Sequence, residues 1–274
     1  MKMRKIPNIL FIAIIILFFA IRIYLSLNLY IKNYPIWGDE MLLSQSITAQ
    51  TIFKSLIYLP ENQTAPPLFI FFTYLLTSLF GINSYILRFI SFAAGILSLF
   101  AFLFLAFKLL KNKLAILTAL FLFVINIPLL YYTNEFKQYS SDVVISLALI
   151  ISYNYISRNL TVKKTLLYCL IAFLSIVSAF PSLYIILLII VLKLFEEKIH
   201  PKQLIYIIST IVCAAGYVFF VFKNCIQTLN KLHEWQEGYL SFTLNSLQTI
   251  FSNFFSYYNF DALIGSIFLF IGVL

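Results

Sequence analysis

Charged residues are scarce in this chain. They account for 11% of its 274 residues, whereas hydrophobic residues account for 62%. The surface of a water-soluble fold needs far more polar side chains than this composition supplies. The scarcity argues against a soluble globular protein and favours a membrane protein.

Other patterns are also missing. The three cysteines show neither metal-ligand nor redox spacing, and no internal repeat or low-complexity tract is present. The apolar runs are continuous and lack the alternation of membrane β-barrel strands. Because backbone polar groups in lipid must be satisfied internally, helices are the remaining solution. We therefore predict an all-α, polytopic transmembrane helical bundle.

Long apolar runs are abundant. The first, near 6–29, follows Lys2, Arg4 and Lys5 and is too long for a cleaved signal peptide, so we expect an uncleaved span with a cytoplasmic N-terminus. Within it, Arg22 is expected to reach the outer interface, with a role inside the bundle as the alternative. The further spans are expected near 85–107, 114–131, 139–157, 165–180, 182–195 and 204–222, with a last one starting near 261.

The apolar run 66–80 is short and decides the orientation of everything after it. If it does not cross the membrane, 12 of the 19 basic residues fall on the cytoplasmic side, namely Lys2, Arg4, Lys5, Lys108, Lys111, Lys113, Arg158, Lys163, Lys164, Lys193, Lys198 and Lys202. If it crosses, the later basic clusters move outside, against the positive-inside rule. We therefore expect 66–80 to be an interfacial helix on the outer face.

The acidic residues follow the opposite distribution. Eight of the ten carboxylates lie on the outer side, namely Asp39, Glu40, Glu61, Glu135, Asp142, Glu234, Glu237 and Asp261. This segregation explains the net charge of +9 without nucleic acid as a partner, and it places any acid–base chemistry outside the cytoplasm. We expect one domain over 1–274, with outer loops at 30–84 and 223–260. The chain stops partway through an apolar run, so we expect it to be partial.

The first outer loop carries the acid pair Asp39 and Glu40 directly after Trp37. Carboxylates at a membrane interface are costly unless they are solvated or paired, which makes this pair a candidate catalytic site. The structural alternative is the start of a helix from Glu40 to about Leu56, with Asp39 as its N-cap or first-turn acid. Both interpretations can hold together.

Two more features surround the run 66–80. Pro66 and Pro67 are expected to set the start of the interfacial helix. Arg88, at the outer mouth of a span, would bind either a lipid phosphate or a substrate phosphate through its planar fork.

A densely polar stretch, 131–142, precedes the fourth span. Tyr139 and Asp142 are expected on one helix face, with Glu135 and Lys137 just before them. The tyrosines fit an aromatic belt, whereas charges at the edge of a bilayer indicate function. In the second outer loop, His233 and Glu237 could approach a metal, but two ligands make no site and an amphipathic helix is preferred. We expect no metal and no other cofactor.

The order of these features resembles a family of membrane glycosyltransferases over about residues 6–145. An Asp-Glu pair, Pro-Pro-Leu at 66–68, Leu-Arg-Phe at 87–89 and a Tyr-Tyr, Glu, Lys, Tyr outer loop follow in turn. The family includes the dolichyl-phosphate-mannose protein mannosyltransferases and the aminoarabinose lipid A transferases. It has the GT-C fold and uses polyprenyl-phosphate sugars as donors.

The resemblance implies roles for the candidate residues. Asp39, with Glu40 beside it, would be the base on an acceptor hydroxyl, and Arg88, Glu135, Lys137, Tyr139 and Asp142 would contact substrate. The chain departs from the family where Ala65 replaces histidine, Lys137 replaces arginine and Gln138 replaces proline.

The implied reaction is inverting sugar transfer to a hydroxyl on a lipid, polysaccharide or protein. It would occur at the extracytoplasmic face of a multi-pass protein in contact with membrane lipids, in a bacterium the inner (plasma) membrane. The alternatives are a transporter or flippase of a lipid-linked or amphiphilic solute, and a truncated, non-catalytic membrane partner. Charges that lie at the outer edge rather than at mid-depth favour the enzyme over the transporter.

Overall fold

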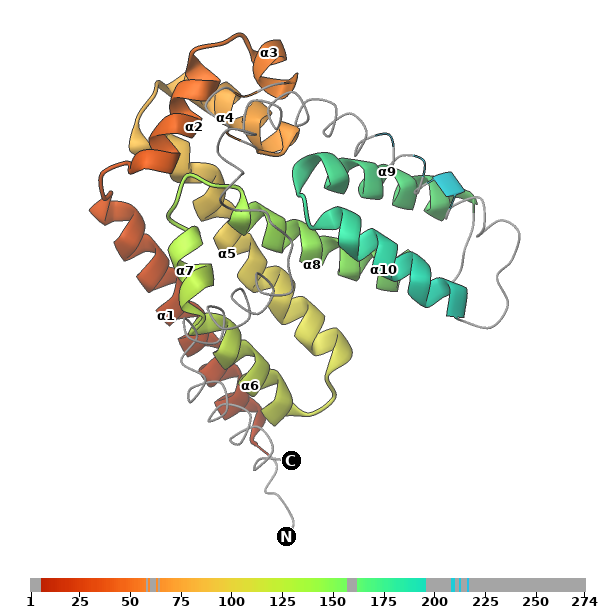
Figure 1. The fold of residues 1–274 in the computed structure, drawn as a ribbon. Helices are drawn as coiled ribbons and strands as arrows, with labels where there is room; N and C mark the ends of the chain where they lie inside the picture. The colour runs from red at the N-terminus through yellow and green to blue at the C-terminus, as the bar shows by residue number, and fades with distance from the viewer. Residues whose placement is uncertain are drawn as a thin grey trace, which may run out of the picture. The chain divides into compact units, whose positions relative to one another are not determined.

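The computed structural model describes residues 6–57, 59, 63, 65–156 and 162–195, together with positions 208, 209, 212 and 216. The regular structure in these ranges is helical and includes no strand (Figure 1), which confirms the all-α class. Apart from those four isolated positions, the expected span 204–222 lies outside the described residues. The expected loop 223–260 and the span after 261 also lie outside them.

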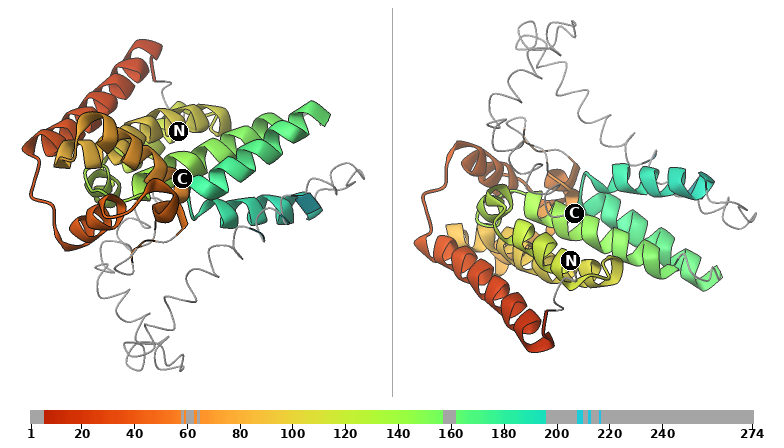
Figure 2. Two further views of the ribbon diagram at one scale, coloured as in Figure 1. Left: turned by 90° about the horizontal axis from the view of Figure 1, so that it is seen from above. Right: turned by 90° about the horizontal axis from the view of Figure 1, so that it is seen from below.

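The longest apolar runs form helices close to their predicted bounds. These helices are α1 (Asn8–Lys32), α5 (Ser84–Leu109), α8 (Tyr139–Ile156), α9 (Val162–Ser178) and α10 (Ser182–Phe195). Two of them, α1 and α5, are long and apolar enough to cross a membrane. At 25 and 26 residues each measures roughly 38 Å, more than the ~30 Å of a hydrocarbon core. Helix α8 contacts α5, α9 and α10, and Figure 2 shows α8, α9 and α10 side by side.

The predicted span 114–131 is divided into two helices, α6 (Lys113–Val124) and α7 (Ile127–Tyr132). Asn126 causes the division because its side chain accepts a hydrogen bond from the Leu129 N–H at 2.9 Å and so caps a new helix. Pro128 then stands in the first turn of α7, where its missing N–H costs nothing.

Arg22 lies against this division. Its side chain is buried, and its Nη1 donates to the carbonyl oxygens of Val124 at 3.2 Å and Asn126 at 3.3 Å. The last carbonyls of a helix have no partner within the helix, so the guanidinium supplies a donor for the Val124 carbonyl at the end of α6. The Asn126 carbonyl also accepts from the Leu130 N–H within α7, at 3.1 Å. These contacts support the alternative role of Arg22 inside the bundle, whereas its depth relative to a membrane interface stays a prediction.

The helix predicted from Glu40 to Leu56 is also divided, into α2 (Gly38–Thr48) and α3 (Ile52–Ile57). Polar side chains at the end of α2 and just after it bond to carbonyl groups of the last turns of α2. Thr48 Oγ1 donates to the Ser44 carbonyl oxygen at 2.9 Å, and Gln50 Nε2 donates to that of Ser46 at 3.3 Å. Such side-chain bonds compete with a continuous helix, which hydropathy alone does not reveal.

Helix α4 (Pro67–Phe80) begins where the two prolines predicted, with Pro66 at its N-cap. Its 14 residues measure roughly 21 Å, less than the thickness of a hydrocarbon core. It ends at Gly81, whose φ of 81° is one that glycine adopts without steric cost. Figure 1 shows α2, α3 and α4 gathered at the end of the helices where α5 begins. The location of α4 at a membrane interface stays a prediction.

One apolar core lies beneath these short helices. It consists of Leu43, Ile47, Leu59, Ala65, Phe69, Ile70, Leu87 and Phe136. Phe136 comes from the loop between α7 and α8, and its fully buried ring stacks on Phe69 with the ring centroids 5.8 Å apart. The core therefore anchors this distant loop against α2 and α4.

Gly95 marks a close approach of α5 to the end of α7, where the same loop begins. A Cβ added to Gly95 would meet Oγ1 of Thr133 and would lie 2.6 Å from its Cγ2 and 2.9 Å from its Cβ. We predict that Gly95→Ala lowers the stability of the protein by about 1–3 kcal/mol through overpacking. Thermal unfolding in detergent measures the change.

Gly38→Ala is the matched control because a Cβ there would meet nothing within 4 Å. It should leave the unfolding temperature nearly unchanged. Thr133→Ala should do less harm in the Gly95→Ala background than in the wild type, and strict additivity of the two substitutions would contradict the contact.

Candidate active site

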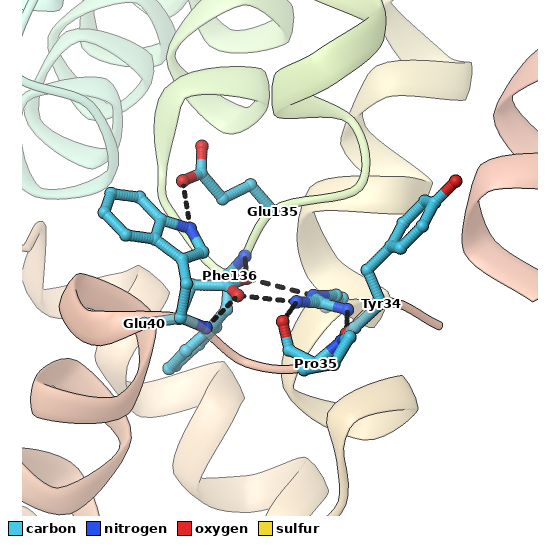
Figure 3. Close-up of polar contacts among 7 residues, drawn as sticks. Tyr34, Pro35, Glu40, Glu135 and Phe136 are labelled. Atoms are coloured by element: carbon cyan, nitrogen blue, oxygen red, sulfur yellow. Dashed lines mark hydrogen bonds and ion pairs between the residues drawn. The ribbon is translucent and has the colours of Figure 1, made fainter. Parts of the chain in front are cut away.

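The carboxylate of Glu40 is the centre of the polar cluster at this end of the molecule (Figure 3). The side chain is fully buried. Its Oε1 accepts hydrogen bonds from Nε of Arg88 at 2.9 Å and from the backbone N–H of Phe136. Its Oε2 accepts from Nη2 of Arg88 and, at 3.4 Å, from the N–H of Trp37. Both oxygens are thus engaged inside the protein.

Arg88 is held in the same way. Besides its two bonds to Glu40, it donates through Nη1 to the carbonyl oxygen of Tyr34 at 2.6 Å and through Nη2 to that of Pro35 at 3.4 Å. Its side chain is 7% exposed. The guanidinium therefore ties the start of α5 to the chain between α1 and α2, and its fork is occupied by protein groups.

Glu135 lies next to this pair without contacting it directly. Its Oε1 accepts a hydrogen bond from the indole Nε1 of Trp37 at 2.8 Å, and its Oε2 is buried without a partner among the described residues. Burial raises the pKa of Glu135 above its ordinary value, and the charge of Glu40 adds to this effect. The Trp37 hydrogen bond and the charges of Lys137 and Arg88 oppose it.

Asp39 and Lys137 form the open side of the site. Asp39 is in the first turn of α2, and its side chain is 54% exposed, in contrast to the adjacent, buried Glu40. Nζ of Lys137 lies 3.6 Å from Oδ2 of Asp39 and donates to Oε1 of Gln63 at 3.3 Å. An accessible carboxylate thus stands beside a largely buried ammonium group. Such an arrangement can accept a proton and stabilise a developing negative charge nearby.

The two remaining predicted residues lie on α8. Tyr139 is exposed and packs its ring against Tyr132, with the ring centroids 4.6 Å apart. Asp142 is buried in the first turn, bonded to the Phe180 backbone in the turn between α9 and α10. Among the described contacts, none joins Asp142 to Asp39 or Lys137. The structure therefore brings five of the seven predicted residues, Asp39, Glu40, Arg88, Glu135 and Lys137, into one cluster. The described contacts of Tyr139 and Asp142 are instead with Tyr132 and Phe180.

Sequence reasoning missed several members of the cluster. Trp37 stands in the acid motif, yet only the structure reveals its bond to Glu135. The carbonyls of Tyr34 and Pro35 and the amide of Phe136 are backbone groups, which no residue pattern identifies. Ser91 donates to the carbonyl oxygen of Lys137 at 2.7 Å, and its position one helical turn after Arg88 was the available signal.

In the part of the chain that the structure describes, no three His, Cys, Asp or Glu side chains gather in a way that could hold a metal ion. His233 and Glu237 lie outside that part.

Comparison with known proteins gives no relative. No family model, curated protein or solved structure matches the chain. The assignment of function therefore depends on the residues themselves.

We predict that Glu40→Ala destabilises the protein strongly, by about 3–5 kcal/mol, because it leaves the buried guanidinium of Arg88 without its counter-charge. The double variant Glu40→Leu with Arg88→Met should unfold at a higher temperature than Glu40→Ala. If the single variant instead retains wild-type thermal stability, the ion pair does not hold the site together.

The stability contribution of Glu135 should depend on pH. Because its folded pKa is raised, the protonated form is favoured in the folded state, and this contribution is lost as the pH rises from about 4.5 through the folded pKa. Glu135→Gln preserves the shape and the acceptor for Trp37 but does not ionise. We expect the unfolding temperature of Glu135→Gln, relative to the wild type, to rise from pH 5 to pH 8, measured in one detergent. A constant or falling difference would contradict the raised pKa.

Proposed function

We propose that the chain is a multi-pass membrane glycosyltransferase of GT-C type that moves a sugar from a polyprenyl phosphate to an acceptor hydroxyl on the extracytoplasmic face. One observation carries the proposal. An exposed carboxylate, Asp39, stands 3.6 Å from the ammonium of Lys137, where the short helices α2 to α4 meet the start of α5. The order of the motifs, Asp-Glu, Pro-Pro-Leu, Leu-Arg-Phe and Glu, Lys, Tyr, supports the same family.

The reaction assigns different tasks to the two charges. The acceptor oxygen forms a bond to the anomeric carbon while the bond from that carbon to the phosphate oxygen breaks. Asp39 takes the proton of the acceptor hydroxyl, and Lys137 stabilises the negative charge that the phosphate gains on leaving. A single displacement of this kind inverts the anomeric centre.

Glu40 and Arg88 have a positioning role in this proposal rather than contact with substrate. Both carboxylate oxygens of Glu40 are already bonded inside the protein, and the guanidinium of Arg88 is bonded to Glu40 and to two backbone carbonyls. Their network fixes the first turn of α2, from which Asp39 projects, and the loop that carries Lys137. Glu135 and Trp37 extend that network.

The membrane setting is part of the proposal. Helices α1 and α5 have the length and apolarity of spans, and the positive-inside rule puts the ends that carry Lys108 and Lys113 in the cytoplasm. The polar cluster then lies at the opposite, outer end, which in a bacterium is the outer side of the inner membrane. The acceptor is a hydroxyl of a lipid, polysaccharide or protein.

Transport of a lipid-linked solute is the second candidate, and one observation favours it. The division between α6 and α7, with the buried Arg22 against it, resembles the broken helices of transporters. The guanidinium of Arg22 bonds to the carbonyls at that division, however, whereas Asp39 is an exposed carboxylate suited to catalysis.

Transfer from a panel of radiolabelled polyprenyl-phosphate sugars, in membranes that contain the protein, tests the proposal. We expect the wild type to turn over at least one donor and Asp39→Asn to lose about 10²–10⁴-fold in rate, the usual contribution of a general base. Unfolding temperature should not change, because Asp39 is half exposed. Glu61→Gln, the same change of charge in the same predicted outer loop, is the control and should retain activity.

Two outcomes count against the proposal in different ways. Full activity of Asp39→Asn would show that Asp39 is not the general base. If folded wild-type protein fails to turn over any donor but moves a labelled lipid-linked sugar across vesicles, the chain is a transporter instead.

A further inference from the structure

Asp39 lies over the ammonium group that the proposed reaction needs. The Lys137 side chain is 11% exposed, whereas that of Asp39 is 54% exposed, so the carboxylate is on the solvent side of the pair. An ammonium has three N–H donors, and the described residues offer Asp39 at 3.6 Å and Gln63 at 3.3 Å. An anion that binds the same ammonium would therefore lie beside Asp39 or replace it.

The two partners differ in how firmly they are held. Lys137 is fixed at its backbone, because its N–H donates to the carbonyl oxygen of Glu135 at 2.8 Å and its own carbonyl accepts from Ser91 at 2.7 Å. The ring of Phe136, next to it, is fully buried. Among the described residues, the carboxylate of Asp39 has a single ion-pair contact, with Lys137, and it can turn into solvent without disturbing the bonds of Glu40.

We infer that Asp39 and a phosphate group compete for the ammonium of Lys137, so that phosphate binding releases Asp39 from its ion pair. The inference rests on the proposed function in taking this phosphate to be that of the donor lipid. The donor would then bind before the acceptor, and the carboxylate would be freed to accept a proton only when the leaving group is in place.

The direction in which one substitution changes the phosphate affinity distinguishes competition from the opposite arrangement. In that arrangement, Asp39 holds Lys137 in position for the phosphate. Under competition, Asp39→Asn strengthens phosphate binding because Lys137 no longer has a rival partner. Under positioning, the same substitution weakens it. The carboxylate of Asp39 is 54% exposed and therefore screened by solvent, so the strengthening should be about fivefold rather than orders of magnitude.

A double-mutant cycle measures this effect as the affinity of purified protein in nanodiscs for a short-chain polyprenyl phosphate. The proteins are the wild type, Asp39→Asn, Lys137→Met and the double variant. We expect Asp39→Asn to bind about fivefold more tightly and Lys137→Met about tenfold more weakly. In the Lys137→Met background, Asp39→Asn should change the affinity less than twofold. Lys137→Arg keeps the positive charge, so Asp39→Asn should still increase the affinity for the phosphate in that background.

The outcomes that overturn the inference are specific. Weaker phosphate binding by Asp39→Asn indicates that Asp39 positions Lys137. Unchanged binding indicates that Asp39 has no effect on the affinity of Lys137 for phosphate. Equal tightening with and without Lys137 indicates general repulsion between charges rather than a shared ammonium. Thermal unfolding of each variant confirms that folded proteins are compared, and the neutral substitution Lys137→Gln replaces Lys137→Met if the latter does not fold.

Further ligands separate this inference from the proposed function. Neutral polyprenol should show no dependence on either residue. If inorganic phosphate or phosphatidylglycerol binds as tightly as polyprenyl phosphate, with the predicted signs, competition holds while the donor class fails. If no phosphate compound binds the wild type, both fail. The predicted signs without sugar transfer from any donor would contradict the proposed function alone.

Discussion

The buried carboxylate of Glu40 is the constraint on which the rest of the site depends. Its partners Arg88 and Phe136 lie 48 and 96 positions away in the chain, so a single side chain joins α2, α5 and the loop before α8. A carboxylate without partners in such a place would cost several kcal/mol. The three segments must therefore assemble together, and the geometry of Asp39, Glu135 and Lys137 follows from that assembly.

The helices were largely predictable because long apolar runs determine them, and α5 and α10 lie within two residues of their expected bounds. The divisions within helices were not. They depend on side chains that cap or compete with the backbone, such as Asn126 between α6 and α7 and Thr48 at the end of α2. A hydropathy profile does not contain these short-range polar bonds. Nor does it indicate that Arg22, a charge inside an apolar helix, finds its partners about a hundred positions later.

For the site, the sequence identified most of the residues, but it did not show which of them are buried and structural and which are exposed to solvent. Asp39 and Glu40 are adjacent acids, and nothing in their composition distinguishes them. The helix does so, because successive residues differ by about 100° around its axis, which turns Glu40 into the core and Asp39 outward. Arg88 was likewise recognisable as important, whereas its bonds to protein groups follow from tertiary contacts that one sequence does not display.

The contact between Arg22 and the end of α6 has a consequence for handling the protein. The first helix supplies a donor that α6 and α7 lack, so it is a structural component and not an exchangeable membrane anchor. Replacing it with a generic anchor sequence for expression would leave the Val124 carbonyl without this donor at the division between those helices. Fusions and redesigned N-termini should therefore retain α1 from Asn8 onward and place any new segment before it.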